Sequence, residues 1–222
     1  MPGSAILFGA IGALTETSDM QRRAFNAAFA EAGLSWHWDW DSYVAMLAAP
    51  GGQDRIADYA ATRGDDVDAA ALHAAKVQHF RTMAHETRLQ PRPGVVATIQ
   101  EAREAGRPVG FVTATGADTV ALILDALQGV DASDFAYIGE AGHVSRGKPA
   151  PDIYLHALSE LGVTADQALA IEDTPESAQA AVAAGIPTLG FPGDAARGRA
   201  FPAGVEVVEA LPSGLLPWRA TL

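Results

Sequence analysis

The chain contains no cysteine. Disulfide bonds, thiolate metal ligands and a thiol nucleophile are therefore excluded, and a reducing cytoplasm is the location we expect. Positive charge is also scarce, because 15 Lys and Arg stand against 27 Asp and Glu, for a formal net charge of −12. Nucleic-acid backbones are held by clustered Lys and Arg, so we expect no nucleic-acid partner.

Long apolar runs are missing as well. No stretch approaches the roughly 20 consecutive apolar residues that a membrane span requires, so we expect no membrane association. Residues 5–14 resemble the apolar core of a signal peptide, but no positive charge precedes them and residues 15–19 are typical of a helix start. We interpret residues 5–14 as a buried strand and loop. At 222 residues the chain is long enough for one α/β domain and a small insertion.

Short apolar runs alternate with helical patterns along most of the chain, and each run is apolar on both faces. The predicted strands are residues 5–8, 109–112, 135–138, 169–171 and 187–191. Strands buried on both faces belong to parallel sheets that helices cover on each side. The spacing of apolar residues predicts helices at 117–124 and 154–161, with Pro151 just inside the start of the second and Gly162 just past its end. These features predict a doubly wound α/β fold with a parallel sheet, whose ligands bind at the carboxyl ends of the strands.

Residues 16–90 interrupt this alternation and have a helical pattern. An apolar stripe at positions 25, 28, 29 and 32 ends at Gly33, and further helices are predicted around 43–47, 56–61 and 69–83. The Pro-Arg-Pro-Gly segment at 91–94 is typical of a connection that returns the chain to the core. We therefore predict a small helical cap, residues 16–90, inserted after the first strand of a core made of residues 1–15 and 91–222.

Polar residues follow several of the predicted strands. Lys148 lies in Gly-Lys-Pro-Ala-Pro-Asp-Ile-Tyr, where two prolines hold the loop so that the ammonium points one way. Glu172 and Asp173 are adjacent acids at a strand end, which are costly unless a cation or hydrogen-bond donors face them. Simpler readings remain open: an exposed surface lysine, a helix N-terminus that favours negative charge and, for Thr113, a strand residue or helix cap.

Taken in order, Thr113, the segment at 147–154 and Glu172-Asp173-Thr174-Pro175 resemble the later motifs of the haloacid dehalogenase (HAD) superfamily. The resemblance implies a Rossmann-like HAD core in which Thr113, Ala114 and Lys148 bind phosphate. It also implies that Asp173 ligates magnesium and that Glu172 supports this metal site. In the superfamily one aspartate attacks phosphorus, a second protonates the leaving oxygen, and the metal ties the first aspartate to the acid after the fourth strand.

Four further segments, at 22–26, 38–41, 51–56 and 92–95, resemble the CbbY-like branch of the superfamily, which contains β-phosphoglucomutase-like sugar-phosphate phosphatases. The cap loop of that branch usually reads Gly-Gly-Lys-Glu-Arg and touches the substrate. Here Gln53 replaces the lysine, which removes a positive charge, whereas Arg55 remains. The resemblance implies a small phosphorylated metabolite as ligand. The tryptophans at 36, 38 and 40 either line a pocket or, as is more common, fill the core of the cap.

The first superfamily motif, Phe-Asp-x-Asp-Gly-Thr-Leu, is changed in this chain. Residues 8–14 read Phe-Gly-Ala-Ile-Gly-Ala-Leu, which places Gly9 at the nucleophile, Ile11 at the acid/base and Ala13 at the threonine. Neither Gly9 nor Ile11 can attack phosphorus or transfer a proton. Loss of a nucleophile from a preorganised site typically costs on the order of a millionfold in rate. We therefore assign no catalytic residue.

Losing two anions together with a dication leaves the formal charge of the site unchanged. This suggests a metal-free site, with the magnesium position at Glu172 and Asp173 vacant and Lys148 paired with Asp173. The leading hypothesis is a HAD-like protein that has lost phosphotransfer and binds a phosphorylated ligand or a partner. Two alternatives stay open: an active phosphatase of small metabolites with a non-standard mechanism, and a non-catalytic interaction or regulatory scaffold whose protein partner the sequence does not indicate.

Overall fold

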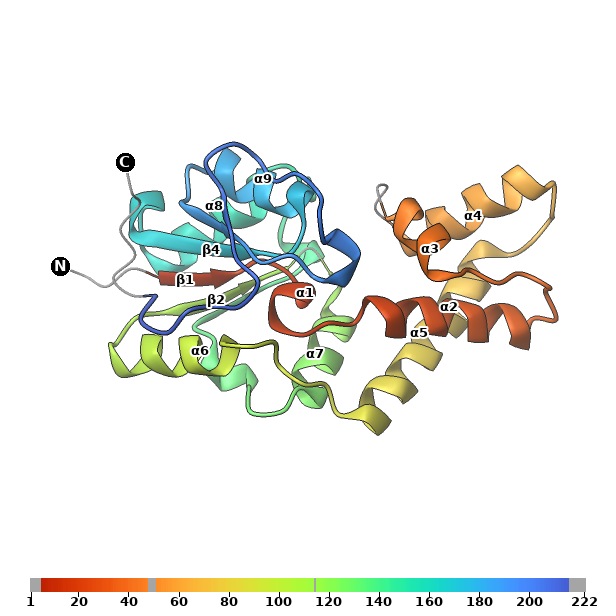
Figure 1. Ribbon diagram of the computed structural model, residues 1–222, viewed down its shortest axis with the longest axis horizontal. Helices are drawn as coiled ribbons and strands as arrows, with labels where there is room; N and C mark the ends of the chain where they lie inside the picture. Colours follow the sequence, from red (N-terminus) through yellow and green to blue (C-terminus); the bar gives the residue numbers. More distant parts are fainter. Residues whose placement is uncertain (1–4, 48–50, 114, 216–222) are drawn as a thin grey trace. The chain divides into compact units, whose positions relative to one another are not determined.

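The computed structural model describes residues 5–47, 51–113 and 115–215 of the chain. It divides into two compact units, Met1–Glu16 with Leu89–Leu222, and Thr17–Arg88. Figure 1 shows the elements of both units. In the described part of the chain, no helix is both long enough and apolar enough to cross a membrane.

The first unit contains a six-stranded sheet and the helices that cover it. Its strands are β1 (Ala5–Phe8), β2 (Val109–Val112), β3 (Tyr137–Gly139), β4 (Ala168–Glu172), β5 (Thr188–Gly190) and β6 (Glu206–Val207). Its α-helices are α1 (Ile11–Leu14), α6 (Val95–Glu104), α7 (Ala117–Ala126), α8 (Asp152–Leu161) and α9 (Pro175–Ala183), and short 3-10 helices cover Ala132–Asp134, Ala141–His143, Ala165–Gln167 and Asp194–Ala196.

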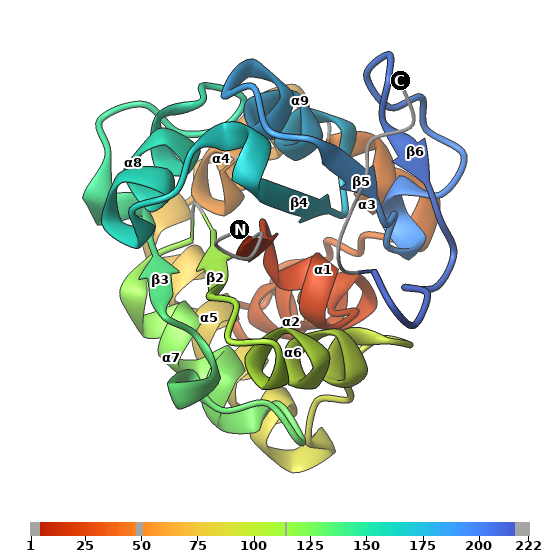
Figure 2. The same cartoon turned by 90° about the vertical axis from the view of Figure 1, so that its left-hand side faces the viewer.

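The strands are parallel and lie in the order β3-β2-β1-β4-β5-β6, which confirms the predicted fold class. Helices α8 and α9 pack on one face of the sheet and α6 on the other, so β1, β2 and β4 are buried throughout (Figure 2). Phe8 pairs with Phe111 of β2 and with Ile171 of β4. The carboxyl ends of these three strands therefore lie side by side. Gly9 follows β1, Thr113 follows β2, and Glu172 is the last residue of β4.

Several local features differ from the predictions. After β1 the chain forms the single helical turn α1, where we expected a loop, and the amide of Thr15 donates to the carbonyl of Ile11 at its end. Helix α8 begins at Asp152, so Pro151 precedes the helix instead of lying inside it. The third strand begins at Tyr137, two residues later than predicted, because a 3-10 turn capped by Asp131 ends just before it.

Helix α6 and strand β6 of the first unit have no counterpart among the predictions. Helix α6 starts directly after Gly94, whose φ of 87° is in the left-handed region and which ends the segment 91–94 that we read as a connection. Strand β6 consists of two exposed residues, so no apolar pattern marks it. The predicted end of α8 is confirmed, because Gly162 has a φ of 64° and its amide donates to the carbonyl of Leu158.

The second unit is helical. It contains α2 (Ser18–Glu31), α3 (Trp40–Met46), α4 (Gly52–Arg63) and α5 (Ala69–Thr87), and α5 packs against α2 and α4. Trp36 and Trp38 lie in its aromatic core with exposed fractions of 5% and 0%, together with Phe25 and Phe29. Trp36 and Trp38 therefore fill the core of the cap and do not line a pocket. Trp40 begins α3 and is half-buried.

Candidate functional site

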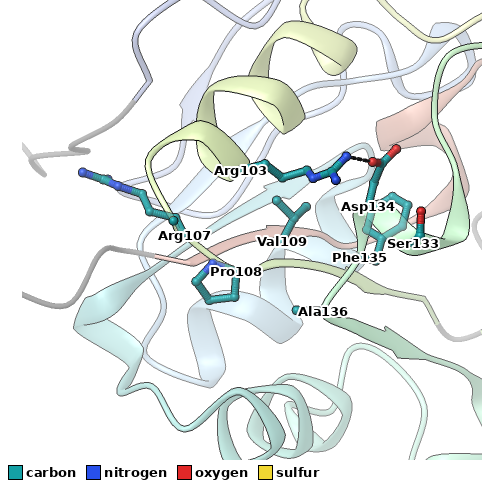
Figure 3. A pocket seen from close by; sticks show the side chains of 9 residues that line it. Arg103, Arg107, Pro108, Val109, Ser133, Asp134, Phe135 and Ala136 are labelled. Carbon is teal, nitrogen blue, oxygen red and sulfur yellow. Dashed lines mark hydrogen bonds and ion pairs between the residues drawn. The ribbon is translucent and has the colours of Figure 1, made fainter.

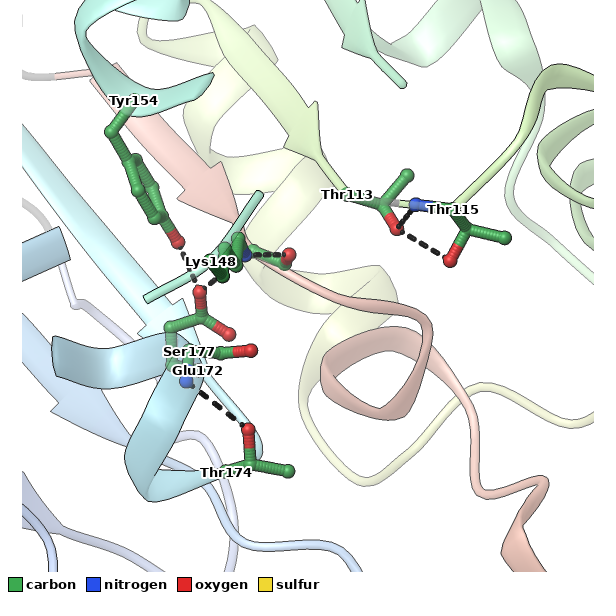
Figure 4. Close-up of polar contacts among 8 residues, drawn as sticks. Thr113, Thr115, Lys148, Tyr154, Glu172, Thr174 and Ser177 are labelled. Atoms are coloured by element: carbon green, nitrogen blue, oxygen red, sulfur yellow. Dashed lines mark hydrogen bonds and ion pairs between the residues drawn. The ribbon is translucent and has the colours of Figure 1, made fainter. Parts of the chain in front are cut away.

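A buried ion pair occupies the carboxyl ends of β1 and β4. The ammonium of Lys148 donates to Glu172 Oε1 at 2.6 Å and to the carbonyl oxygen of Gly9 (Figure 4). The hydroxyl of Tyr154, from α8, donates to the same carboxylate oxygen of Glu172. The side chains of Lys148 and Glu172 are 7% and 0% exposed. We call Lys148, Glu172 and Tyr154 the Lys148 network.

The hypothesised pairing of Lys148 with Asp173 is wrong, because Lys148 pairs with Glu172. Glu172 is the last residue of β4, and its carboxylate lies beside Gly9, where Lys148 also arrives. The carboxylate of Asp173 lies elsewhere, against Gly12: a Cβ built on Gly12 would be only 1.9 Å from Asp173 Oδ2. The two adjacent acids therefore have separate environments.

Gly9 lies against the Lys148 network. A Cβ built on Gly9 would be 2.1 Å from Glu172 Oε1 and 2.1 Å from the Tyr154 hydroxyl oxygen, far closer than any ordinary contact. The volume that a side chain at position 9 requires is thus filled by Glu172 and Tyr154. Ile11, the other position at which the superfamily has a catalytic aspartate, begins α1 and is half-buried.

Asp173 carries an unusual protonation equilibrium. Burial raises the pKa of Asp173 to about 7, and the negative charge of Glu172 acts in the same direction, whereas the positive charges of Lys148 and Arg92 oppose the shift. Asp173 Oδ1 and Glu172 Oε2 are buried and have no hydrogen-bond partner in the described part of the chain. Burial also raises the pKa of Tyr154 well above its usual value, and the charge of Glu172 adds to this effect, so its hydroxyl remains a donor.

We expect Asp173→Asn to make the protein more stable at pH 8 and to change its stability little at pH 4. The carboxyl titrates near 3.8 when unfolded and near 7 when folded, so the folded protein holds one more proton between these values. The proton held by Asp173 in the folded protein contributes fully to stability below about pH 4. This contribution falls by about 1.4 kcal/mol per pH unit as the pH rises from about 4 to 7, and it is absent above pH 7. Urea denaturation of the wild-type and Asp173→Asn proteins from pH 4 to 8 gives the free energy of unfolding of each as a function of pH. A constant difference between the two proteins over this range would contradict the raised pKa of Asp173.

The structure places Thr113 at the same edge of the sheet, but not in the Lys148 network. Its side chain is 2% exposed, and its hydroxyl accepts from the amide of Thr115 at 3.1 Å and donates to the Thr115 hydroxyl at 3.0 Å (Figure 4). These contacts form a local turn of the kind that threonine often caps. Ala114, also expected to bind phosphate, lies outside the described residues.

The residues at the strand ends do not fit a magnesium site. Magnesium requires near-octahedral oxygen ligands, and the superfamily site depends on an aspartate at the position of Gly9. Glu172 already gives one oxygen to Lys148, and Asp173 takes up a proton near neutral pH. Within residues 5–47, 51–113 and 115–215, no group of three His, Cys, Asp or Glu is arranged to hold a metal ion.

Arg92 holds the altered first segment in place, a role that the sequence did not indicate. Its guanidinium donates to the carbonyls of Gly12 at 2.7 Å, Phe191 at 2.6 Å and Pro192 at 2.7 Å. It also lies 3.4 Å from the centre of the Phe191 ring. Because these bonds join α1 to the two residues that follow β5, the backbone around Gly12 is fixed although the superfamily aspartates are absent.

The second unit contains a cluster of positive and titratable groups, which we call the cap cluster: Arg55, His73 and Lys76. Lys76, on α5, is 8% exposed, and its ammonium donates to Gln21 and lies 4.8 Å from the centre of the Phe25 ring. Burial and, to a smaller extent, the positive charge of Arg55 lower the pKa of Lys76 to about 8. Lys76 forms no ion pair within the described residues. A buried ammonium without an anionic partner is costly, which makes Lys76 a candidate for contact with an anion.

Arg55 and His73 complete the cap cluster. Burial lowers the pKa of His73, and the charges of Lys76 and Arg55 act in the same direction. His73 also lies against the cap loop, since a Cβ on Gly52 would be 2.7 Å from its Nε2. Arg55 donates to the carbonyl of Met46 at 3.1 Å. Gln53, expected to touch substrate, is exposed on the first turn of α4.

Sequence reasoning missed Lys76 and His73. A signal was nevertheless present, because Leu72, Lys76 and Phe80 share the buried face of α5 at a spacing of four residues. A lysine at a core position of an amphipathic helix is rare unless it is paired or functional. Lys76 and Lys148 are also the only lysines of the chain.

A cavity of about 400 Å³ lies at the opposite edge of the sheet, beside the first residue of β2 (Figure 3). Its lining residues are Arg103, Gly106, Arg107, Pro108, Val109, Ser133, Asp134, Phe135 and Ala136. Arg103 is already paired with Asp134 there. Ligands of doubly wound sheets bind at the carboxyl ends of the strands, so we do not assign the site to this cavity.

A parallel sheet with Lys148 and two acids at its strand ends defines a Rossmann-like α/β core with a charged site at the carboxyl ends of the strands. The haloacid dehalogenase-like hydrolase family matches residues 4–185, and the chain belongs to this family. It is similar to the plasmid-encoded CbbY protein of Cupriavidus necator, with 41% identity over 197 residues that cover 85% of this chain and 78% of that protein.

Solved structures agree with this placement in the CbbY-like branch. CbbY from Rhodobacter sphaeroides in complex with phosphate has a TM-score of 0.83 and 35% identity, covering 93% of this chain and 94% of that one. A putative β-phosphoglucomutase from Thermotoga maritima has a TM-score of 0.71 at 20% identity, covering 85% of each chain, and shows the fold alone. The chain is thus a phosphatase-like member of the family, related to CbbY.

Proposed function

We propose that this protein has lost magnesium-dependent hydrolysis of phosphate esters and retains the binding of a small phosphorylated metabolite, without a metal. The proposed binding depends on one observation: Lys76 is buried in the cap cluster and forms no ion pair among the described residues. A phosphate group supplies a negative charge that can pair with Lys76. Arg55 offers a planar set of donors suited to phosphate, and Lys76 offers a point charge.

The loss of hydrolysis follows from the residues at the strand ends. Gly9 has no side chain to attack phosphorus, and Ile11 has no proton to give. The remaining groups do not replace them: Tyr154 donates to Glu172, and Asp173 lies against Gly12. An active hydrolase would need a different nucleophile or an activated water, for which the described contacts offer no arrangement.

Relatives support the class of ligand. The R. sphaeroides CbbY structure contains phosphate, and a CbbY variant in which one aspartate is replaced by asparagine contains xylulose 1,5-bisphosphate. A relative from Streptomyces hygroscopicus, 28% identical over 186 residues, is a validoxylamine A 7'-phosphate phosphatase. These proteins act on or bind phosphorylated sugars and sugar-like compounds, so a sugar phosphate is the ligand class that we expect here.

Calorimetric titration with xylulose 1,5-bisphosphate and with inorganic phosphate, without magnesium, tests this function. We expect the wild-type protein to bind the sugar bisphosphate and to melt at a higher temperature in its presence. Lys76→Met should weaken binding by roughly tenfold to hundredfold, the usual cost of losing a hydrogen bond to a charged group. Arg81→Met removes a positive charge from an exposed position of the same helix and should leave the affinity unchanged.

Two outcomes would contradict the proposal. One is a wild-type protein that no sugar phosphate stabilises, which would favour the scaffold alternative. The other is an equal loss of affinity in Lys76→Met and Arg81→Met, which would mean that general surface charge, and not the cap cluster, attracts the ligand. Circular dichroism of both variants establishes that each is folded.

A further inference from the structure

We infer that the core pocket of this protein is occupied by its own side chains: Glu172 takes the place beside Gly9 and neutralises Lys148, so that the core binds neither phosphate nor metal. This inference concerns the first unit alone. It does not depend on whether the cap cluster binds a ligand, and it assigns to Glu172 the role of an internal counter-anion.

The contacts of Lys148 are the first step of the argument. Its ammonium has three protons to donate, and two acceptors are within reach, Glu172 Oε1 and the Gly9 carbonyl. Both side chains of the ion pair are almost fully buried, at 7% and 0% exposure. A buried pair of this kind attracts strongly because little water screens it. Lys148 therefore has one proton left, and a phosphate oxygen that approached it would be repelled by the Glu172 carboxylate at 2.6 Å from the ammonium.

The space beside Gly9 is the second step. Any side chain at position 9 begins with a Cβ, and that atom would lie 2.1 Å from both Glu172 Oε1 and the Tyr154 hydroxyl. The present positions of Glu172 and Tyr154 therefore require glycine at position 9. The absence of a side chain at position 9 and the position of Glu172 are therefore coupled through this space.

The second carboxylate follows the same pattern. Asp173 Oδ2 lies where the Cβ of any larger residue at position 12 would be, at 1.9 Å. Glu172, the last residue of β4, and Asp173, the next residue, are thus both packed against glycines of the segment that follows β1. Glu172 is paired with Lys148, and the carboxylate of Asp173 is held against Gly12. The charge of Lys148 is thus balanced by Glu172 without metal or phosphate.

Titration with inorganic phosphate in a Lys76→Met background tests the inference, because that background removes the cap cluster's contribution. We expect no phosphate binding by the single variant. Adding Glu172→Gln keeps the shape of the side chain but removes its charge, and should create phosphate binding at least about tenfold stronger, which a further Lys148→Met change abolishes. Phosphate binding by the Lys76→Met protein that depends on Lys148 would overturn the inference, as would a folded Glu172→Gln variant that gains none.

Two further measurements keep the inference testable if Glu172→Gln fails to fold. Gly9→Ala should lower the melting temperature by at least about 4 °C, whereas Gly142→Ala, whose Cβ would meet nothing within 4 Å, should leave it unchanged. Magnesium should not raise the melting temperature of the wild-type protein. Equal effects of the two alanines would overturn the inference, and so would magnesium stabilisation that Asp173→Asn removes.

Discussion

Changing Gly9 and Ile11 to aspartate together is expected to create magnesium-dependent phosphatase activity, at least about 10⁴-fold above the rate without protein. The double variant has a nucleophile at the end of β1, an acid two residues later, and Lys148 and Asp173 from the neighbouring loops. An aspartate at position 9 needs the volume that Glu172 and Tyr154 now fill. We therefore expect the variant to melt at a lower temperature than wild type, and magnesium to restore part of the difference.

Phosphate release from a panel of sugar phosphates measures this gain. The matched control is Gly9→Asn with Ile11→Asp, which introduces the same volume and the same general acid but no nucleophile, and which should remain inactive. A folded double variant without activity would show that the pocket has lost more than its two aspartates. Equal activity in the asparagine control would show that position 9 is not the point of attack.

Lys148→Met is expected to lower the free energy of unfolding by about 3–5 kcal/mol, because it leaves the fully buried Glu172 carboxylate without its cation. Few single changes in this chain should cost as much. Urea denaturation of wild type, Lys148→Met, Glu172→Gln and the double variant forms a double-mutant cycle that isolates the pair.

In that cycle, the double variant should recover a large part of the stability lost in Lys148→Met, because replacing both charges removes the need to bury either alone. Arg81→Met, on the surface of the second unit, is again the control and should change stability by less than about 0.5 kcal/mol. A Lys148→Met protein as stable as this control would contradict a buried ion pair at the strand ends.

The sheet could be predicted from the sequence because its strands are apolar on both faces, which is a strong pattern even in runs of four residues. β1 and β2 have the predicted bounds, and β4 and β5 differ at their ends by one residue. The helical turn α1 could not be predicted, because its four residues are stabilised by tertiary contacts such as the Arg92 bond to the Gly12 carbonyl. The exposed strand β6 carries no pattern at all.

The sequence predicted that the polar residues lie at the ends of the strands, but it did not predict which of them form ion pairs with each other. Proline spacing and strand order placed Lys148 correctly, since the structure brings its ammonium to Gly9. Whether Lys148 meets Glu172 or Asp173 depends on side-chain directions, which alternate along a strand and turn again at its end. Formal charge alone does not distinguish two adjacent acids. The roles of Thr113, Gln53 and Arg55 in binding stay predictions.

The most direct test of the account is phosphate release by the purified wild-type protein, with magnesium and a panel of sugar phosphates that includes xylulose 1,5-bisphosphate. The account predicts no release above the rate without protein, together with calorimetric binding of at least one of these compounds. Turnover that Lys148→Met abolishes would contradict it, because such turnover would require the pocket beside Gly9 to be open and catalytic.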